Sequence, residues 1–180
     1  MIFKKTAVKD AFIIEIEKIT DERGFFARAW CKNEFEAHKL NTNLVQVNIA
    51  FNEKISTIRG MHYQISPFEE TKLIRCTKGA IYDVIIDIRK SSPTYMKWIG
   101  VELREDNPRM LYVPEGFAHG YQTLEDKTEV TYQVSSFYTP NSEGGIRWND
   151  PAFNITWPDT DVRVISEKDQ NWSDYKNRND

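Results

Sequence analysis

The stretch from Leu44 to Ile65, LVQVNIAFNEKISTIRGMHYQI, decides the fold prediction for this chain. It holds two segments rich in Val, Ile and aromatic residues, LVQVNIAFN and STIRGMHYQI, which meet at the polar break EKIS. Apolar and polar side chains alternate along the first segment, which is the pattern of a half-buried strand. We therefore predict two successive β-strands here.

The same pattern of short segments and turn residues continues along the chain. Turn-forming clusters recur at DERG, EKIS, TKGA, SSPT, EDNP, PEGF and NSEGG. The further segments predicted as strands are KLIRCT (72–77), AIYDVIIDIR (80–89), WIGVEL (98–103), RMLYVP (109–114) and EVTYQVSSFY (129–138). Only CKNEFEAHKLN (31–41), with Phe35 and Leu40 on one side, looks helical. This organisation predicts an all-β antiparallel sandwich or barrel.

Length and charge set limits on the function. A chain of 180 residues has a size that commonly forms one domain, so we predict a single domain over residues 1–180. The 24 basic and 27 acidic residues leave a net charge of -3, which provides no strong positive field for nucleic acid or an anionic membrane. We therefore expect neither nucleic acid nor a membrane as a partner.

The cysteines and the N-terminal segment favour a cytoplasmic location. Cys31 and Cys76 are far apart and form no CxxC or Cys/His cluster, which indicates reduced thiols rather than a disulfide or a zinc finger. The first 20 residues contain an apolar run of only four residues, AFII, which is too short for a signal peptide or a membrane span. The polar C-terminal segment, residues 171–180, is predicted to fray.

The three histidines are the first candidates for chemistry. His38 falls in the charged helical segment and is predicted to be a surface residue. His62 and His119 lie on or beside predicted strands among aromatic residues, in MHYQ and GFAHGY. A single histidine in such a place is more often a hydrogen-bonded core residue than a catalyst.

Polar neighbours strengthen the case for a site. Strand alternation places His62 on the same face as Gly60 and Gln64, and places Arg59 on the opposite face. A bulge at Gly60 would re-aim Arg59. The further polar side chains that would line the same cavity are Gln46, Asn48, Lys72, Tyr132 and Tyr138. Taken singly, the two amides could pack at a strand edge and the lysine could be solvated.

A metal centre is one alternative for such a barrel. PEGFAH, from Pro114 to His119, has the P-x-G-x-x-H pattern of the second metal-binding box of cupin barrels. The first box should hold two histidines one residue apart and then a glutamate, but His62 is followed by Tyr63 and Gln64. Since a site of two histidines and one carboxylate needs three fixed ligands, we expect no metal here.

A cavity with histidine, lysine and tyrosine suits proton transfer. Histidine, with an unperturbed pKa of ~6.5, can accept a proton near neutrality. Lysine or arginine can stabilise the enolate that forms when a proton leaves a carbon beside a ketone. A tyrosine that returns the proton on the opposite face would invert the stereocentre. A carboxylate would hold the second nitrogen of the base, and the candidates are Asp83, Asp87 and Asp169.

Six blocks of the sequence resemble the dTDP-4-dehydrorhamnose 3,5-epimerase family. They are DERGFF, QVNIAFN, IRGMHYQ, KLIRCTKGAIYDVIIDIRKSSPTY, VPEGFAHGYQTL and GGIRWNDPAFNITWP, which run in order over nearly the whole chain. The resemblance implies a jelly-roll cupin barrel and a homodimer without a metal or other cofactor. It also implies inversion of C3 and C5 of a nucleoside diphospho-4-keto-6-deoxy sugar, in the first place conversion of dTDP-4-dehydro-6-deoxy-D-glucose to dTDP-4-dehydro-L-rhamnose.

The resemblance further implies the roles of individual residues. His62 would be the base, Asp169 its carboxylate partner, Tyr132 the general acid and Lys72 the enolate-stabilising lysine. The positions that match contacts to the sugar, the diphosphate and the nucleotide are Arg59, His119, Gln46, Asn48 and Tyr138. Arg23 and Phe26 in DERGFF match positions that reach the nucleotide from the partner subunit.

One position departs from the pattern of that family. RGFFARAW places Arg28 where the family commonly has a glutamate near the nucleobase. Because a guanidinium only donates hydrogen bonds and a carboxylate only accepts them, Arg28 either changes the nucleotide preference or turns outward. The alternative functions are epimerisation of one carbon only or of another nucleotide sugar, 3,4-ketoisomerisation, and non-catalytic binding of a sugar nucleotide.

Overall fold

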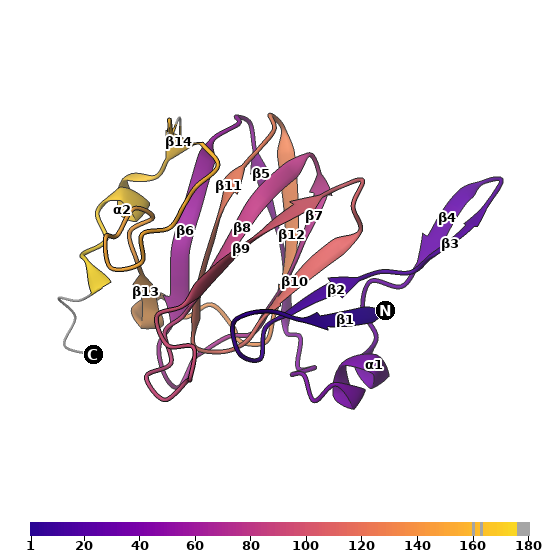
Figure 1. The fold of residues 1–180 in the computed structure, drawn as a ribbon, viewed down its shortest axis with the longest axis horizontal. Coiled ribbons are helices and arrows are strands. Elements are labelled where there is room, and N and C mark those ends of the chain that lie inside the picture. Colours follow the sequence, from indigo (N-terminus) through magenta and orange to yellow (C-terminus); the bar gives the residue numbers. More distant parts are fainter. Residues whose placement is uncertain (160, 163, 176–180) are drawn as a thin grey trace.

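Two facing antiparallel sheets form the body of the protein (Figure 1). The computed structural model describes residues 1–159, 161–162 and 164–175. The first sheet has the order β1 (Ile2–Lys5), β2 (Phe12–Glu15), β10 (Arg109–Val113), β7 (Lys72–Lys78), β12 (Thr128–Val134) and β5 (Gln46–Asn52). The second has the order β13 (Glu143–Gly145), β6 (Thr57–Gln64), β11 (Phe117–Thr123), β8 (Ala80–Asp87) and β9 (Trp98–Arg104). This architecture confirms the predicted all-β jelly-roll barrel.

Smaller elements surround the two sheets. Strands β3 (Lys18–Asp21) and β4 (Gly24–Ala27) form a separate hairpin, and β14 (Val164–Ile165) pairs in parallel with β6. The helices are α1 (Lys32–Ala37), a 3₁₀ turn over Pro140–Ser142, and α2 (Glu167–Gln170). The barrel therefore has short flanking helices, and α1 lies within residues 31–41, the segment predicted to be helical. No helix in the described part of the chain is long and apolar enough to cross a membrane.

Every segment predicted as a strand is a strand in the structure, but the last one is shorter than expected. Strand β12 ends at Val134, so Tyr138 lies in the following loop and not on the strand. Val134 pairs with Gln46, the first residue of β5, and with Lys72, the first residue of β7. Beyond Val134 the chain has no neighbouring strand on either side, and the strand therefore ends.

The space between the sheets has an apolar end and a polar end. Ile74 on β7 and Val130 on β12 belong to the apolar cluster there. Two residues away along the same strands, Lys72 and Tyr132 share the faces of Ile74 and Val130 because alternate residues of a strand point the same way. The change from apolar to polar residues along these inward faces creates the polar end of the barrel, where the site lies.

The outer faces of the sheets are also covered. Helix α1 places Phe35 among Ile14 and Met110 on the outer face of the first sheet. The chain after β13 packs Phe153 and Trp157 against the outer face of the second sheet. This C-terminal covering brings β14 and α2 alongside β6 (Figure 1).

The edge strand β5 turns polar side chains inward and apolar side chains outward, the reverse of an ordinary surface strand. Its polar residues Gln46 and Asn48 line a cavity inside the barrel, which confirms that they share a face. Val47, Ile49 and Phe51 on the other face are 63%, 69% and 44% exposed. A row of exposed apolar side chains on an edge strand is a surface that another chain can cover.

The β3–β4 hairpin projects away from the barrel, on the side opposite α2 (Figure 1). Ile19, Phe25 and Phe26 on this hairpin are more than half exposed. At the other end of the chain, residues 176–180 of the segment predicted to fray lie outside the described residues.

Candidate active site

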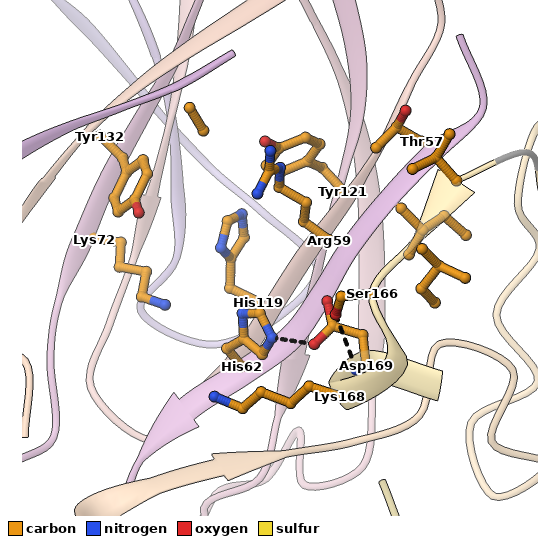
Figure 2. A pocket seen from close by; sticks show the side chains of 14 residues that line it. Thr57, Arg59, His62, Lys72, His119, Tyr121, Tyr132, Ser166, Lys168 and Asp169 are labelled. Carbon is orange, nitrogen blue, oxygen red and sulfur yellow. Dashed lines mark hydrogen bonds and ion pairs between the residues drawn. The ribbon is translucent and has the colours of Figure 1, made fainter. Parts of the chain in front are cut away.

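A cavity of about 460 Å³ lies at the polar end of the barrel (Figure 2). Its polar and aromatic lining residues are Thr57, Arg59 and His62 from β6, Lys72 from β7, His119 and Tyr121 from β11, Tyr132 from β12, and Ser166, Lys168 and Asp169 at α2. A second cavity of about 380 Å³ shares His62, Lys72 and Tyr132 with the first. The two cavities therefore form one two-lobed site around these three side chains.

His62 is paired with Asp169 across the wall of this site. His62 Nε2 lies 2.6 Å from Asp169 Oδ1, and the side chains are 34% and 6% exposed (Figure 2). The second carboxylate oxygen accepts a hydrogen bond from the Gly60 amide at 3.1 Å. Burial raises the pKa of Asp169, but the hydrogen bond and charge of His62 and the Gly60 amide outweigh burial and lower this pKa below its usual value. Asp169 is therefore ionised at neutral pH and fixes one ring nitrogen of His62.

The local sequence explains why Asp169 reaches His62. Strand β14 pairs with the start of β6, and α2 begins two residues later. Ser166 caps this helix by accepting a hydrogen bond from the Asp169 amide at 3.1 Å. The backbone amide of Asp169 thus binds the capping serine, while the Asp169 carboxylate is free to point at β6. Of the three carboxylates considered from sequence, Asp169 is the one that contacts His62.

A second histidine–aspartate pair lies deeper in the barrel. His119 Nε2 is 2.6 Å from Asp83 Oδ1, and the Asp83 side chain is fully buried. Asp83 was a candidate partner for the base, but it belongs to His119 because alternate residues of β8 and β11 face the barrel interior. Asp87, the remaining candidate, binds Arg89, Ser92 and Thr94 outside the site.

The bulge considered at Gly60 is present and interrupts the alternation along β6. His119 lies opposite His62 and Tyr121 lies opposite Arg59, so two steps on β11 correspond to three steps on β6. This extra residue is a bulge, and it turns Arg59 and His62 toward the same cavity. Gly60 has a φ of 115°, and a Cβ at this position would lie 2.6 Å from Gly120 Cα, so only glycine fits the bulge.

Arg59 is held in place from β5. Its Nε donates to Asn52 Oδ1 at 2.7 Å, and one terminal nitrogen donates to the Phe51 carbonyl at 3.2 Å. Asn52 is buried and also bonds the Tyr121 hydroxyl. The guanidinium therefore has a fixed direction at the cavity wall, as binding of an anionic group requires.

Lys72 on β7 and Tyr132 on the neighbouring strand β12 lie at the junction of the two lobes. The Lys72 side chain is only 9% exposed and lies 3.1 Å from Glu70, so it is not a solvated charge. Burial raises the pKa of Tyr132, and the negative charge of Glu70 raises it further. The phenol is therefore protonated at neutral pH and can act as an acid.

The second lobe ends in a hydrogen-bonded group of polar side chains. The Tyr138 amide donates to Gln46 Oε1 at 3.1 Å, and the Tyr138 hydroxyl donates to Glu143 at 2.9 Å. Lys168 Nζ also contacts Glu143, at 2.5 Å. Asn48 lines the same lobe. The structure thus brings the predicted residues Gln46, Asn48 and Tyr138 together.

The hairpin residues lie outside the site of their own chain. Arg23, at the turn, is 83% exposed and pairs with Asp21. Phe26 is 65% exposed. Arg28 is 60% exposed, lies 3.9 Å from Glu34, and faces a surface hollow at the base of the hairpin. None of these three lines either lobe.

Several residues of the site were not found from the sequence. They are Asn52, Glu70, Tyr121, Glu143, Ser166 and Lys168. The alternation of side chains along β5 could have revealed Asn52, because Asn52 continues the inward-facing series of Gln46 and Asn48. SEKD, with serine three residues before a carboxylate, is a helix-start signal that could have predicted α2. His38, in contrast, is exposed as predicted.

The described residues contain no group of three His, Cys, Asp or Glu side chains arranged to hold a metal ion. The Nε2 atom of each histidine in the site contacts a carboxylate instead: His62 contacts Asp169, and His119 contacts Asp83. Histidine–carboxylate pairs of this kind suit hydrogen bonding and proton transfer.

Comparison with known proteins identifies the family. The model of the family described as dTDP-4-dehydrorhamnose 3,5-epimerase matches residues 5–177. The chain belongs to this family. A family relative, the dTDP-4-dehydrorhamnose 3,5-epimerase of Shigella flexneri, is 44% identical over 168 residues, which cover 93% of this chain and 92% of the relative.

Solved structures of family enzymes superpose closely on the barrel. The dTDP-4-dehydrorhamnose 3,5-epimerase of Bacillus anthracis, with TDP and pyrophosphate bound, has a TM-score of 0.91 at 41% identity and covers 94% of this chain and 97% of its own. A 3'-monoepimerase from Streptomyces bikiniensis, in complex with dTDP-quinovose, has a TM-score of 0.86 at 29% identity and covers 95% of this chain and 86% of its own. The fold is thus similar both to an enzyme named a 3,5-epimerase and to one named a 3'-monoepimerase.

Proposed function

We propose that the protein inverts C3 and C5 of a dTDP-4-keto-6-deoxy sugar by removing and returning the proton beside the ketone. The observation that carries this proposal is the His62–Asp169 pair on the wall of a cavity that also contains Lys72 and Tyr132. The names and bound ligands of the family members support the choice of substrate.

His62 is the base in this mechanism. The ionised Asp169 accepts a hydrogen bond from Nε2–H, so Nδ1 carries the lone pair that takes the proton from carbon. Asp169 then stabilises the imidazolium that forms. The arrangement follows the logic of the histidine–carboxylate pair in hydrolases, with a carbon acid in place of a hydroxyl.

Lys72 and Tyr132 complete the reaction. Lys72 stabilises the negative charge that develops on the C4 oxygen as the enolate forms. Tyr132, whose raised pKa keeps it protonated, delivers a proton to the opposite face of the ring. Arg59 and His119 bind the sugar and diphosphate, and Gln46, Asn48 and Tyr138 contact the nucleotide. No resident cofactor has a part in this scheme.

A homodimer completes the site in this proposal. The exposed apolar row of Val47, Ile49 and Phe51 on β5 provides a surface for a second copy. The projecting hairpin would place the second copy's Arg23 and Phe26 at the nucleotide end of the site, where their large exposed side chains would become buried. Sedimentation should give a dimer in solution, and Val47→Asp should shift it toward the monomer.

Arg28 bears on the nucleotide preference. In the dimer it would approach the nucleobase with donors in place of the glutamate's acceptors. Wild type and Arg28→Glu should therefore differ in their relative affinity for dTDP and other nucleoside diphosphates in calorimetry. Equal relative affinities would mean that Arg28 keeps its outward contact with Glu34 and has no part in specificity.

The direct test uses dTDP-4-keto-6-deoxy-D-glucose in D₂O, with deuterium at C3 and C5 followed by NMR. Exchange at both carbons with an L-configured product supports 3,5-epimerisation. Exchange at C3 alone would instead assign a 3-epimerase, the second candidate that the monoepimerase similarity favours. Formation of a 3-keto product would indicate ketoisomerisation, and binding without exchange would indicate a non-catalytic binder.

We also infer that residues 1–180 act as one domain in the cytoplasm, consistent with two free cysteines.

A further inference from the structure

Gln64 ends the RGMHYQ stretch and has no part in the proposed mechanism. It is the last residue of β6, two positions after His62, and it is only 4% exposed. Its side chain lines the second lobe beside Tyr138. A buried amide at a strand end requires several partners, and these partners show what it does.

The Gln64 amide joins two loops that are distant in sequence. Its Nε2 donates to the carbonyl of Phe68 at 2.9 Å and to the carbonyl of Phe137 at 3.2 Å. Its Oε1 accepts from the Thr139 amide at 2.7 Å. Both N–H groups are therefore used, one on the loop between β6 and β7 and one on the loop after β12. The same side chain both donates to the second loop and accepts from it.

These two loops carry the exposed aromatic residues at this end of the site. Phe68, Phe137 and Tyr138 are 39%, 65% and 60% exposed, so little apolar packing fixes them. The bonds of Gln64 bracket Tyr138 on both sides, at Phe137 and at Thr139. This bracketing holds the Tyr138 amide against Gln46 and its hydroxyl against Glu143.

We infer that Gln64 is a positioning residue for nucleotide binding, which acts by holding the Tyr138 loop to the catalytic strand. The inference rests on the proposed function, because it takes the second lobe as the nucleotide end. Loss of the bonds would leave the loop to be ordered by the ligand, which weakens binding without touching His62 or Tyr132. Gln64 thus couples the position of the base on β6 to the position of the nucleotide.

Gln122 provides a matched control on the neighbouring strand β11. It is also buried, its Nε2 donates to the Asp159 carbonyl at 2.8 Å, and its Oε1 accepts from the Asp159 amide at 3.0 Å. Gln122 lines neither lobe of the site. Gln64→Glu and Gln122→Glu therefore make the same chemical change: each keeps the acceptor and removes the donors that bind a loop carbonyl.

The experiment measures dTDP affinity by calorimetry, and KM and kcat with the sugar nucleotide, for wild type and both variants. Gln64→Glu should weaken dTDP binding and raise KM by about tenfold, while kcat stays within about threefold. Gln122→Glu should leave dTDP affinity and KM at the wild-type values, whatever its melting temperature. Equal affinities and KM values in the two variants would overturn the inference, as would a fall in kcat alone.

Hydrogen exchange in the wild type keeps the inference testable if Gln64→Glu does not fold. The Thr139 amide should exchange slowly, and more slowly still with saturating dTDP, because the ligand and Gln64 hold the same loop. Exchange of this amide that dTDP leaves unchanged would overturn the inference. A wild type that binds dTDP but exchanges no deuterium on the sugar would overturn the epimerase proposal alone, since the affinity comparison still applies. A wild type that does not bind dTDP would overturn both.

Discussion

The described residues of the protein include two histidine–aspartate pairs with the same contact and different surroundings. His62 Nε2 to Asp169 and His119 Nε2 to Asp83 are both 2.6 Å. The His62 side chain is 34% exposed and that of His119 only 10%. The second oxygen of Asp169 accepts from the Gly60 amide, whereas the buried Oδ2 of Asp83 has no hydrogen-bond partner among the described residues. Contact geometry alone therefore does not identify a base.

The difference follows from where the four residues lie in the fold. His119 and Asp83 stand on the paired strands β11 and β8, with their side chains inside the barrel. Asp169 comes from a separate short helix that approaches β6 from its edge. A pair that bridges two elements at a cavity wall can meet a substrate and exchange protons with it. A pair inside one sheet is better placed to fix a ring that only donates or accepts a hydrogen bond.

The largest effect that separates the two pairs is expected for Asp169→Asn. An amide cannot stabilise the imidazolium formed when His62 takes the proton, and it favours the wrong tautomer. The kcat should fall by about 10³-fold, in the range known for such carboxylate partners. Steady-state assays give this value, with His38→Asn, an exposed change at the end of α1, as the unchanged control. A fall of less than about tenfold would remove Asp169 from this role.

A second test of the comparison asks which group donates the proton, Tyr132 or the His119–Asp83 pair. Tyr132→Phe removes the donor on the opposite face, so full inversion should fall by about 10²-fold while deuterium exchange at C3 falls less. NMR of the products and of the recovered substrate separates the two rates. Inversion at the wild-type rate would show that another group donates the proton, and His119 with Asp83 would be the first candidate.

The His119–Asp83 pair should matter more for stability than the His62–Asp169 pair. Asp83→Ala leaves the His119 ring without its buried partner, and the free energy of unfolding should fall by about 2 kcal/mol. Asp169→Asn keeps a hydrogen-bonding group against a half-exposed ring and should cost less than about 1 kcal/mol. Urea unfolding of both variants at pH 7 measures the difference. The reverse ranking would contradict the division into a structural pair and a reactive pair.

The smallest effect is a change in the pH dependence of stability. The pKa of Asp169 is lower in the folded protein than its usual value near 4, so its contribution to stability is present above about pH 4 and is lost as pH falls through the folded value. The stability difference between wild type and Asp169→Asn should therefore shrink below about pH 4. Urea unfolding between pH 3 and 7 tests this, and a difference that grows toward acid would contradict the lowered pKa.

The sequence predicted the parts of the fold that depend on local pattern. Alternation along β5 and the dense Val, Ile and Tyr content of β8 were enough to place strands. It could not show that β12 would end at Val134, since this depends on where β5 and β7 begin. It also could not show the bulge at Gly60, which arises from the register between β6 and β11 and reverses the predicted face of Arg59.

The site was predicted in its residue types and in one of its two histidine–aspartate pairings. Histidine and carboxylate candidates were visible in the sequence, and the resemblance implied Asp169 as the partner of His62. The pairing of Asp83 with His119 requires knowledge that β8 lies beside β11, which is a long-range contact. The role of Gln64 depends likewise on two loops that approach each other only in the folded chain.

Deuterium incorporation at C3 tests most directly which of the two histidines is the base. His62→Asn and His119→Asn, each saturated with dTDP-4-keto-6-deoxy-D-glucose in D₂O, would be followed side by side by NMR. We predict that exchange in His62→Asn is at least about 10³-fold slower than in wild type, while His119→Asn retains exchange within about tenfold. Exchange that persists in His62→Asn and is lost in His119→Asn would contradict the account and make the buried pair the reactive one.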